Sequence, residues 1–82
     1  FHANTTIPFR LAEAAFVQID IWDLRGRLVR KLVRERATPG DHRALWDGLD
    51  DSGRRLTAGM YFYRMSVNGR HLVATEKALL LK

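Results

Sequence analysis

The 82-residue sequence contains no cysteine, only two prolines and no long uninterrupted run of apolar residues. Without cysteine, no disulfide bond can stabilise the fold, so a chain of this length depends on a compact core. A helix that crosses a bilayer needs about 20 largely apolar residues in succession, and no such run is present. These absences predict one small domain, residues 1–82, without a transmembrane segment and with little material for an enclosed catalytic cavity.

Basic residues outnumber acidic residues, and the net charge is +5. This balance favours anionic partners. The basic residues are densest between positions 25 and 36, at Arg25, Arg27, Arg30, Lys31, Arg34 and Arg36. One interpretation is an electrostatic surface for a polyanion. The other is that these side chains cover the solvent face of one strand and protect its edge from pairing. Because the run contains no aromatic residue on which bases could stack, the second interpretation is favoured.

The strongest strand pattern covers residues 58–67, where apolar and polar residues alternate at a period of two. One face carries Tyr61, Tyr63, Met65 and Val67. The other face carries Arg64 and Ser66. Asn68-Gly69 follows, and this dipeptide between apolar runs is a strong signal for a tight hairpin turn. We therefore expect a hairpin from Met60 to Leu81.

Four further strands are expected at residues 5–11, 16–24, 28–33 and 42–46. Pro8 restricts the first to a sheet edge, because proline cannot donate a backbone hydrogen bond. Residues 47–59 predict a polar loop, with Leu56 closing one end of the core. The predicted core residues are Ile7, Phe9, Ile19, Ile21, Trp46, Tyr61, Tyr63 and Met65. The spacing of strands and turns predicts an all-β, antiparallel, immunoglobulin-like (fibronectin III-like) β-sandwich of six to seven strands.

The sequence shows little that favours catalysis. Asp47, Asp50 and Asp51 share one loop, but their spacing does not match an EF-hand calcium loop, and we expect them to shape Asx-turns. The three histidines, His2, His42 and His71, are too widely spaced to predict a zinc site. No serine lies in a nucleophile-elbow motif and no phosphate-binding loop is present. We therefore predict no catalytic residue, metal site, cofactor or small-molecule substrate.

Several segments together resemble a known family. They are residues 1–11, the turn Asp23-Leu24-Arg25-Gly26-Arg27, the segment Trp46-Asp47-Gly48 through Arg54, the segment from Ala58 to Arg64, and the closing residues 77–82. In this order they resemble the C-terminal immunoglobulin-like domain of bacterial secreted proteins. That domain looks like the type IX secretion sorting domain and is similar to the immunoglobulin-like module of the flagellar hook-capping protein.

The resemblance implies a non-catalytic, C-terminal module of a larger exported protein, located outside the cell or on its surface after crossing the outer membrane. Its partners would be the export machinery or other domains of the parent protein. Two alternatives remain: a structural or assembly subunit that associates through strand edges, and a polyanion-binding module that uses the basic run. The residues predicted to bind a partner are Arg25, Arg27, Arg30, Lys31, Arg34 and Lys82.

Overall fold

A computed structural model describes residues 5–71 and 76–80, with side chains described for residues 5–70. These residues form seven strands and no helix. The strands are β1 (Thr5–Leu11), β2 (Ala15–Trp22), β3 (Leu28–Ala37), β4 (Gly40–Trp46), β5 (Gly59–Val67), β6 (Arg70–His71) and β7 (Glu76–Leu80). In this described part of the chain, no helix has the length and apolarity needed to cross a bilayer.

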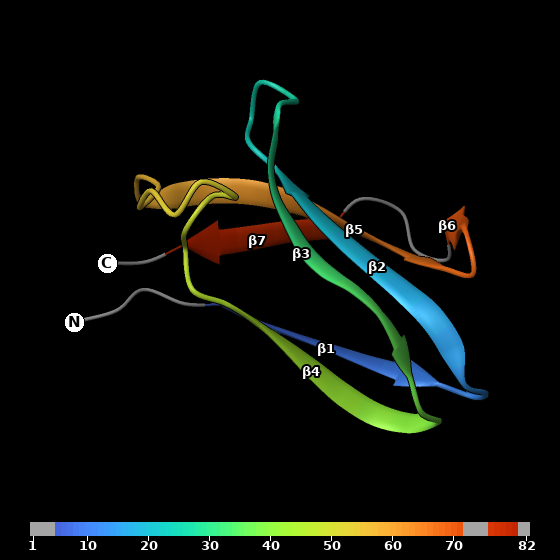
Figure 1. Cartoon of the computed structure of the whole chain (residues 1–82). Coiled ribbons are helices and arrows are strands. Elements are labelled where there is room, and N and C mark those ends of the chain that lie inside the picture. The colour runs from blue at the N-terminus through green and yellow to red at the C-terminus, as the bar shows by residue number, and fades with distance from the viewer. Residues whose placement is uncertain (1–4, 72–75, 81–82) are drawn as a thin grey trace.

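The strands form two sheets, and every strand pair is antiparallel. Strands β1 and β4 make a two-stranded sheet, and the larger sheet has the order β3-β2-β5-β6, with β7 also paired to β5. Figure 1 shows the β1–β4 pair lying below the larger sheet. The predicted all-β, antiparallel sandwich is thus confirmed.

The core lies between the two sheets and is built from alternating residues of β2. Val17, Ile19 and Ile21 are fully buried, while the intervening residues of β2 are only partly buried. Ile7 of β1 and Trp46 of β4 contribute the largest buried side chains of the small sheet. Burying one such aliphatic side chain stabilises the fold by about 1.5–3 kcal/mol. This gain holds the small sheet against the large one without a disulfide.

The structure divides the predicted core residues into two groups. Ile7, Ile19, Ile21, Trp46, Tyr61 and Met65 are buried. Phe9 and Tyr63 are half-buried and pack against the buried clusters. Ser66 was expected on the solvent face but is buried, because β2 and β6 flank it on both sides. Its hydroxyl donates to Gln18 Oε1 at 3.0 Å, which satisfies the buried polar group.

The predicted end of the third strand, Val33, is wrong, because β3 continues to Ala37. Residues 34–36 pair with Gln18, Val17 and Phe16 of β2. Their polar side chains break the apolar alternation, but the backbone ladder continues regardless of side-chain polarity. Apolar pattern alone therefore could not detect this extension.

The predicted hairpin after β5 is present, and the described parts of its second strand are β6 and β7. Val67 pairs with Arg70, and the two turn residues, Asn68 and Gly69, have φ values of 51° and 82°. Two successive positive φ angles are the signature of a type I′ turn, which suits the twist of a hairpin. The rest of the partner strand is β7, which pairs with the beginning of β5. Leu81 lies outside the described residues.

Candidate functional site

The basic run predicted to bind a partner lies in the β2–β3 turn and along β3. Three of its members are paired with aspartates. In the first pair, Arg27 Nε lies 3.0 Å from Asp23 Oδ2. Arg34 forms an ion pair with Asp20, and Arg30 forms one with Asp47. Half of the predicted polyanion surface is thereby neutralised within the domain. Lys82, also predicted to bind a partner, lies outside the described residues.

Asp23 organises the turn between β2 and β3. One of its carboxylate oxygens accepts hydrogen bonds from the backbone amides of Arg25 and Arg27, at 2.9 and 3.0 Å. Gly26 completes the turn with φ of 80°, a conformation that suits glycine. The backbone amide of Arg27 is the main reason that the pKa of Asp23 lies below its usual value. The carboxylate of Asp23 therefore accepts its hydrogen bonds from residues of its own turn.

Arg30 fastens the loop of residues 47–58 to β3. One of its terminal nitrogens donates to the Leu49 carbonyl at 2.9 Å and to Asp47 Oδ1 at 3.1 Å. The side chain is only 23% exposed. The sequence-based view of Arg30 as a solvated residue is therefore wrong, because the loop folds back over its guanidinium group.

Asp51 caps part of the outer edge of β3. Its amide donates to the Val29 carbonyl at 3.0 Å, and its carboxylate accepts from the Lys31 amide at 3.0 Å. These are the bonds that a neighbouring strand would otherwise make. The loop therefore blocks strand addition at Val29–Lys31, while β3 beyond this point has no other strand neighbour in the described part of the chain.

Asp50 shapes the tip of the same loop, as the sequence predicts. Its Oδ1 accepts from the Ser52 hydroxyl at 2.7 Å and from the amides of Ser52 and Arg54 at 2.9 Å. The hydrogen bond from the Ser52 hydroxyl is the main cause that lowers the pKa of Asp50. Among the described residues, no group of three or more His, Cys, Asp or Glu side chains is arranged to hold a metal ion.

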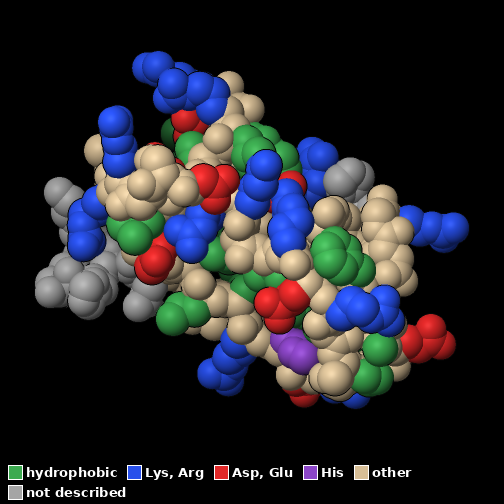
Figure 2. Space-filling view, viewed as in Figure 1, with side chains coloured by type: hydrophobic (Ala, Val, Ile, Leu, Met, Phe, Trp, Pro, Cys, Tyr) green, Lys and Arg blue, Asp and Glu red, His purple; other side chains and the backbone are tan. Residues whose placement is uncertain are grey.

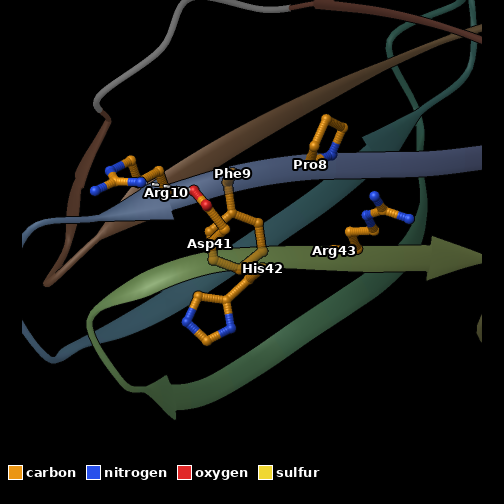
Figure 3. A pocket seen from close by; sticks show the side chains of 6 residues that line it. All are labelled: Pro8, Phe9, Arg10, Asp41, His42 and Arg43. Carbon is orange, nitrogen blue, oxygen red and sulfur yellow. Dashed lines mark hydrogen bonds and ion pairs between the residues drawn. The ribbon is translucent and has the colours of Figure 1, made fainter.

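A solvent-exposed hollow of about 600 Å³ lies on the β1–β4 sheet. Figure 3 shows Phe9 and His42 lying one against the other across the two strands, with Arg10 beside Asp41. The two rings are stacked with centroids 5.2 Å apart, and His42 Nε2 lies 2.7 Å from the Thr38 carbonyl oxygen. Arg10 pairs with Asp41 at 3.1 Å. Arg10, Asp41 and His42 are thus each bonded to another group of the domain, which suits a structural role.

Sequence reasoning missed a group of apolar residues, here called the outer apolar patch, on the outer face of the large sheet and in the β2–β3 turn beside it: Trp22, Leu24, Met60 and Phe62. Trp22 lies directly opposite Phe62 in the β2–β5 register. The guanidinium carbon of Arg64 lies 5.2 Å from the Trp22 ring centroid, a cation–π contact. Phe62 was overlooked because it interrupts the alternation of β5. The available signal was the period-two spacing of Met60 and Phe62, which places both on the face of the strand opposite to Tyr61.

The basic side chains on the face of the molecule seen in Figure 2 are dispersed. Figure 2 shows Lys and Arg side chains spread over the visible face and interspersed with acidic and hydrophobic ones. A polyanion site requires basic groups gathered in one field. The arrangement on this face therefore gives the polyanion interpretation little support.

The chain is similar to known proteins in both sequence and fold. A family model described as "FlgD Ig-like domain" matches residues 2–70. FlgD from Xanthomonas campestris, whose structure is described in terms of the hook capping essential for flagellar assembly, is 25% identical, with a TM-score of 0.72 over 96% of this chain. FlgD from P. aeruginosa is 21% identical, with a TM-score of 0.68 over 94% of this chain. The chain spans only 56% and 61% of these two structures, respectively. No curated protein matches it.

Proposed function

Because the chain belongs to the FlgD Ig-like domain family, we propose that it is a non-catalytic assembly module of a larger exported protein of the hook-cap type. Its role is to hold protein partners in place rather than to transform a substrate. It works outside the cytoplasmic membrane, at the flagellar hook. The parent protein contributes further chain, in keeping with the partial coverage of the two FlgD structures.

The match of the family model over residues 2–70 is the observation that carries this proposal. The likeness to the X. campestris protein supports it, since that protein is linked to hook capping and flagellar assembly. The assembly role corresponds to the second of the functions expected from the sequence. Export sorting by the type IX system and polyanion binding remain predictions, which neither the family model nor the two structures address.

The fold offers surfaces that suit such a role. Within the described residues, β4 pairs only with β1, so its other edge is available to a further strand. Only a short part of the β3 edge is capped by the loop through Asp51. Strand addition at an open edge is a common way for one protein to dock on another.

Deleting the codons for residues 1–82 from the gene of the parent protein tests the proposal in its source bacterium. Electron microscopy would count assembled hooks, and immunoblots would measure the parent protein inside and outside the cell. We expect the truncated protein to be exported and assembly to fail. The control is the full-length protein with Glu13→Gln, a change at an exposed position between β1 and β2.

Two other results would contradict the proposal. Truncated protein trapped inside the cell would assign export sorting to this domain. Normal export together with normal assembly would show that the domain serves neither purpose.

A further inference from the structure

Two members of the outer apolar patch are large apolar side chains that are exposed to solvent. Leu24 is 66% exposed and Met60 is 40% exposed, and both lie next to the half-buried pair Trp22 and Phe62. Large apolar side chains gathered on one exposed face mark interaction sites more often than isolated ones do. Trp, Met, Phe and Arg are also the residues enriched at protein interfaces.

Two small hollows give the patch its shape. One, of about 270 Å³, is lined by Trp22, Leu24, Phe62 and Arg64, among others. The other, of about 210 Å³, is lined by Leu24, Arg25 and Met60, among others. Both hollows have Asp23 and Leu24 in their walls. A partner chain could place an apolar side chain in each hollow, with Leu24 lying between the two.

The charge around the patch is positive. Arg25 and Arg64 make no ion pair with a carboxylate within residues 5–70. Among the residues with described side chains, Asp23 is the only acidic one that lines either hollow, and it is already bonded to Arg25 and Arg27 of its own turn. Two guanidinium groups therefore remain available to a carboxylate that approaches the patch. A charged partner that fits this field is acidic.

A second copy of the same domain fits less well. A two-fold symmetric contact would place the patch against itself and bring the arginines of both copies together. A polyanion also fits less well, because apolar side chains contribute to the walls of both hollows and one of the three arginines beside them, Arg27, is already paired with Asp23. The charge and shape together favour a peptide segment in which bulky apolar residues stand next to carboxylates.

We propose that the outer apolar patch is a docking site for an acidic, apolar segment of a partner protein. This inference rests on the proposed assembly function and names the surface and the partner chemistry that it uses.

The test compares full-length parent proteins that carry Leu24→Asp, Leu24→Lys or the matched control Leu45→Asp. Leu45 is also strongly exposed, at 61%, but lies on β4 in the other sheet. We expect Leu24→Asp to weaken binding of the partner at least about tenfold, as loss of an interface hot spot does, and thereby to reduce the number of assembled hooks. Leu24→Lys should reduce the number of assembled hooks less than Leu24→Asp does, because the positive charge of lysine attracts an acidic partner. Leu45→Asp should give as many hooks as the unmodified protein. Unchanged circular dichroism would establish that all three variants fold.

A binding measurement with the full-length protein identifies the partner chemistry. The probe is a short fluorescent peptide of leucine and glutamate, and its control replaces every glutamate with glutamine. We expect the acidic peptide to bind more tightly than the control, and Leu24→Asp, but not Leu45→Asp, to weaken that binding at least about tenfold. Equal binding of the two peptides would overturn the proposed charge preference. A heparin fragment that bound and depended equally on Leu24 would point instead to a polyanion.

The outcomes separate this inference from the proposed function. If Leu24→Asp assembles normally while deletion of residues 1–82 blocks assembly, the patch is not the docking site but the assembly role stands. If the deletion also leaves assembly intact, the proposed function itself fails. If Leu24→Asp abolishes self-association of the parent protein in analytical ultracentrifugation, the occupant is a second copy and the inference is overturned.

Discussion

Replacing Trp46 tests the packing on which the sandwich depends. The indole is fully buried, and its ring meets Tyr61 edge-on with centroids 5.2 Å apart. Its Nε1 donates to the Leu49 carbonyl at 3.0 Å. Trp46→Ala removes all three contributions and leaves a cavity, so we expect a loss of about 3–5 kcal/mol in the free energy of unfolding.

A more conservative change, Trp46→Phe, separates the hydrogen bond from the packing. The Leu49 carbonyl also accepts from Arg30 at 2.9 Å, so it keeps a partner when the indole is removed. The lost hydrogen bond therefore costs only about 0.5–1.5 kcal/mol, and the smaller ring adds a small cavity. We expect a total loss of about 1–2 kcal/mol.

Urea unfolding followed by far-UV circular dichroism measures both losses. A domain of 82 residues is expected to have a stability of about 4–12 kcal/mol. At a slope of about 1 kcal/mol per molar urea, Trp46→Phe lowers the midpoint by about 1–2 M. Trp46→Ala lowers it by about 3 M or more, or leaves the chain unfolded.

The control for this series is Trp22→Phe, which changes a half-buried tryptophan on the outer face and should cost less than about 1 kcal/mol. A loss below about 1.5 kcal/mol for Trp46→Ala would refute the reasoning, because a fully buried indole cannot be removed so cheaply.

Three further predictions concern the loop, the turn and the acidic residues. Arg30→Met should destabilise the fold by about 1–2 kcal/mol and speed amide exchange at Lys31 and Asp51, because the loop loses its anchor; Arg25→Met is the exposed control, and equal effects of the two variants would refute the anchoring role. Gly69→Ala should cost about 1 kcal/mol, measured by thermal unfolding, because alanine disfavours the φ of 82° at that position, and an unchanged melting temperature would argue against the type I′ turn. The carboxyl groups of Asp23 and Asp50 should titrate below 3.8 by carbon-13 NMR. Because hydrogen bonds lower their pKa values in the folded state, their contribution to stability is present above the unfolded value and is lost as the pH falls through the folded values. Asp23→Asn should therefore make stability less dependent on pH below about pH 4, and a dependence as steep as that of the unmodified chain would contradict this.

The local chemistry of the chain is readable from the sequence. Alternation in β2 marked Ile19 and Ile21 as inward-facing, since neighbouring side chains on a strand point to opposite faces. The Asn68-Gly69 turn was readable for a similar reason, because few residues accept positive φ. Both are properties of a few neighbouring residues, and the all-β class follows from them.

Tertiary structure decided what the charged and outward-facing residues do. Arg30 looked like one solvated residue in a basic run, but the loop of residues 47–58 folds over it, and no local pattern records that contact across the chain. Trp22 and Phe62 lie 40 positions apart in the sequence and become neighbours only through the β2–β5 register. The sequence by itself determined which residues form strands and which turn, because those preferences are local. Only the folded chain determined which charges are neutralised and which apolar side chains gather on one exposed face, because both depend on how distant strands are paired.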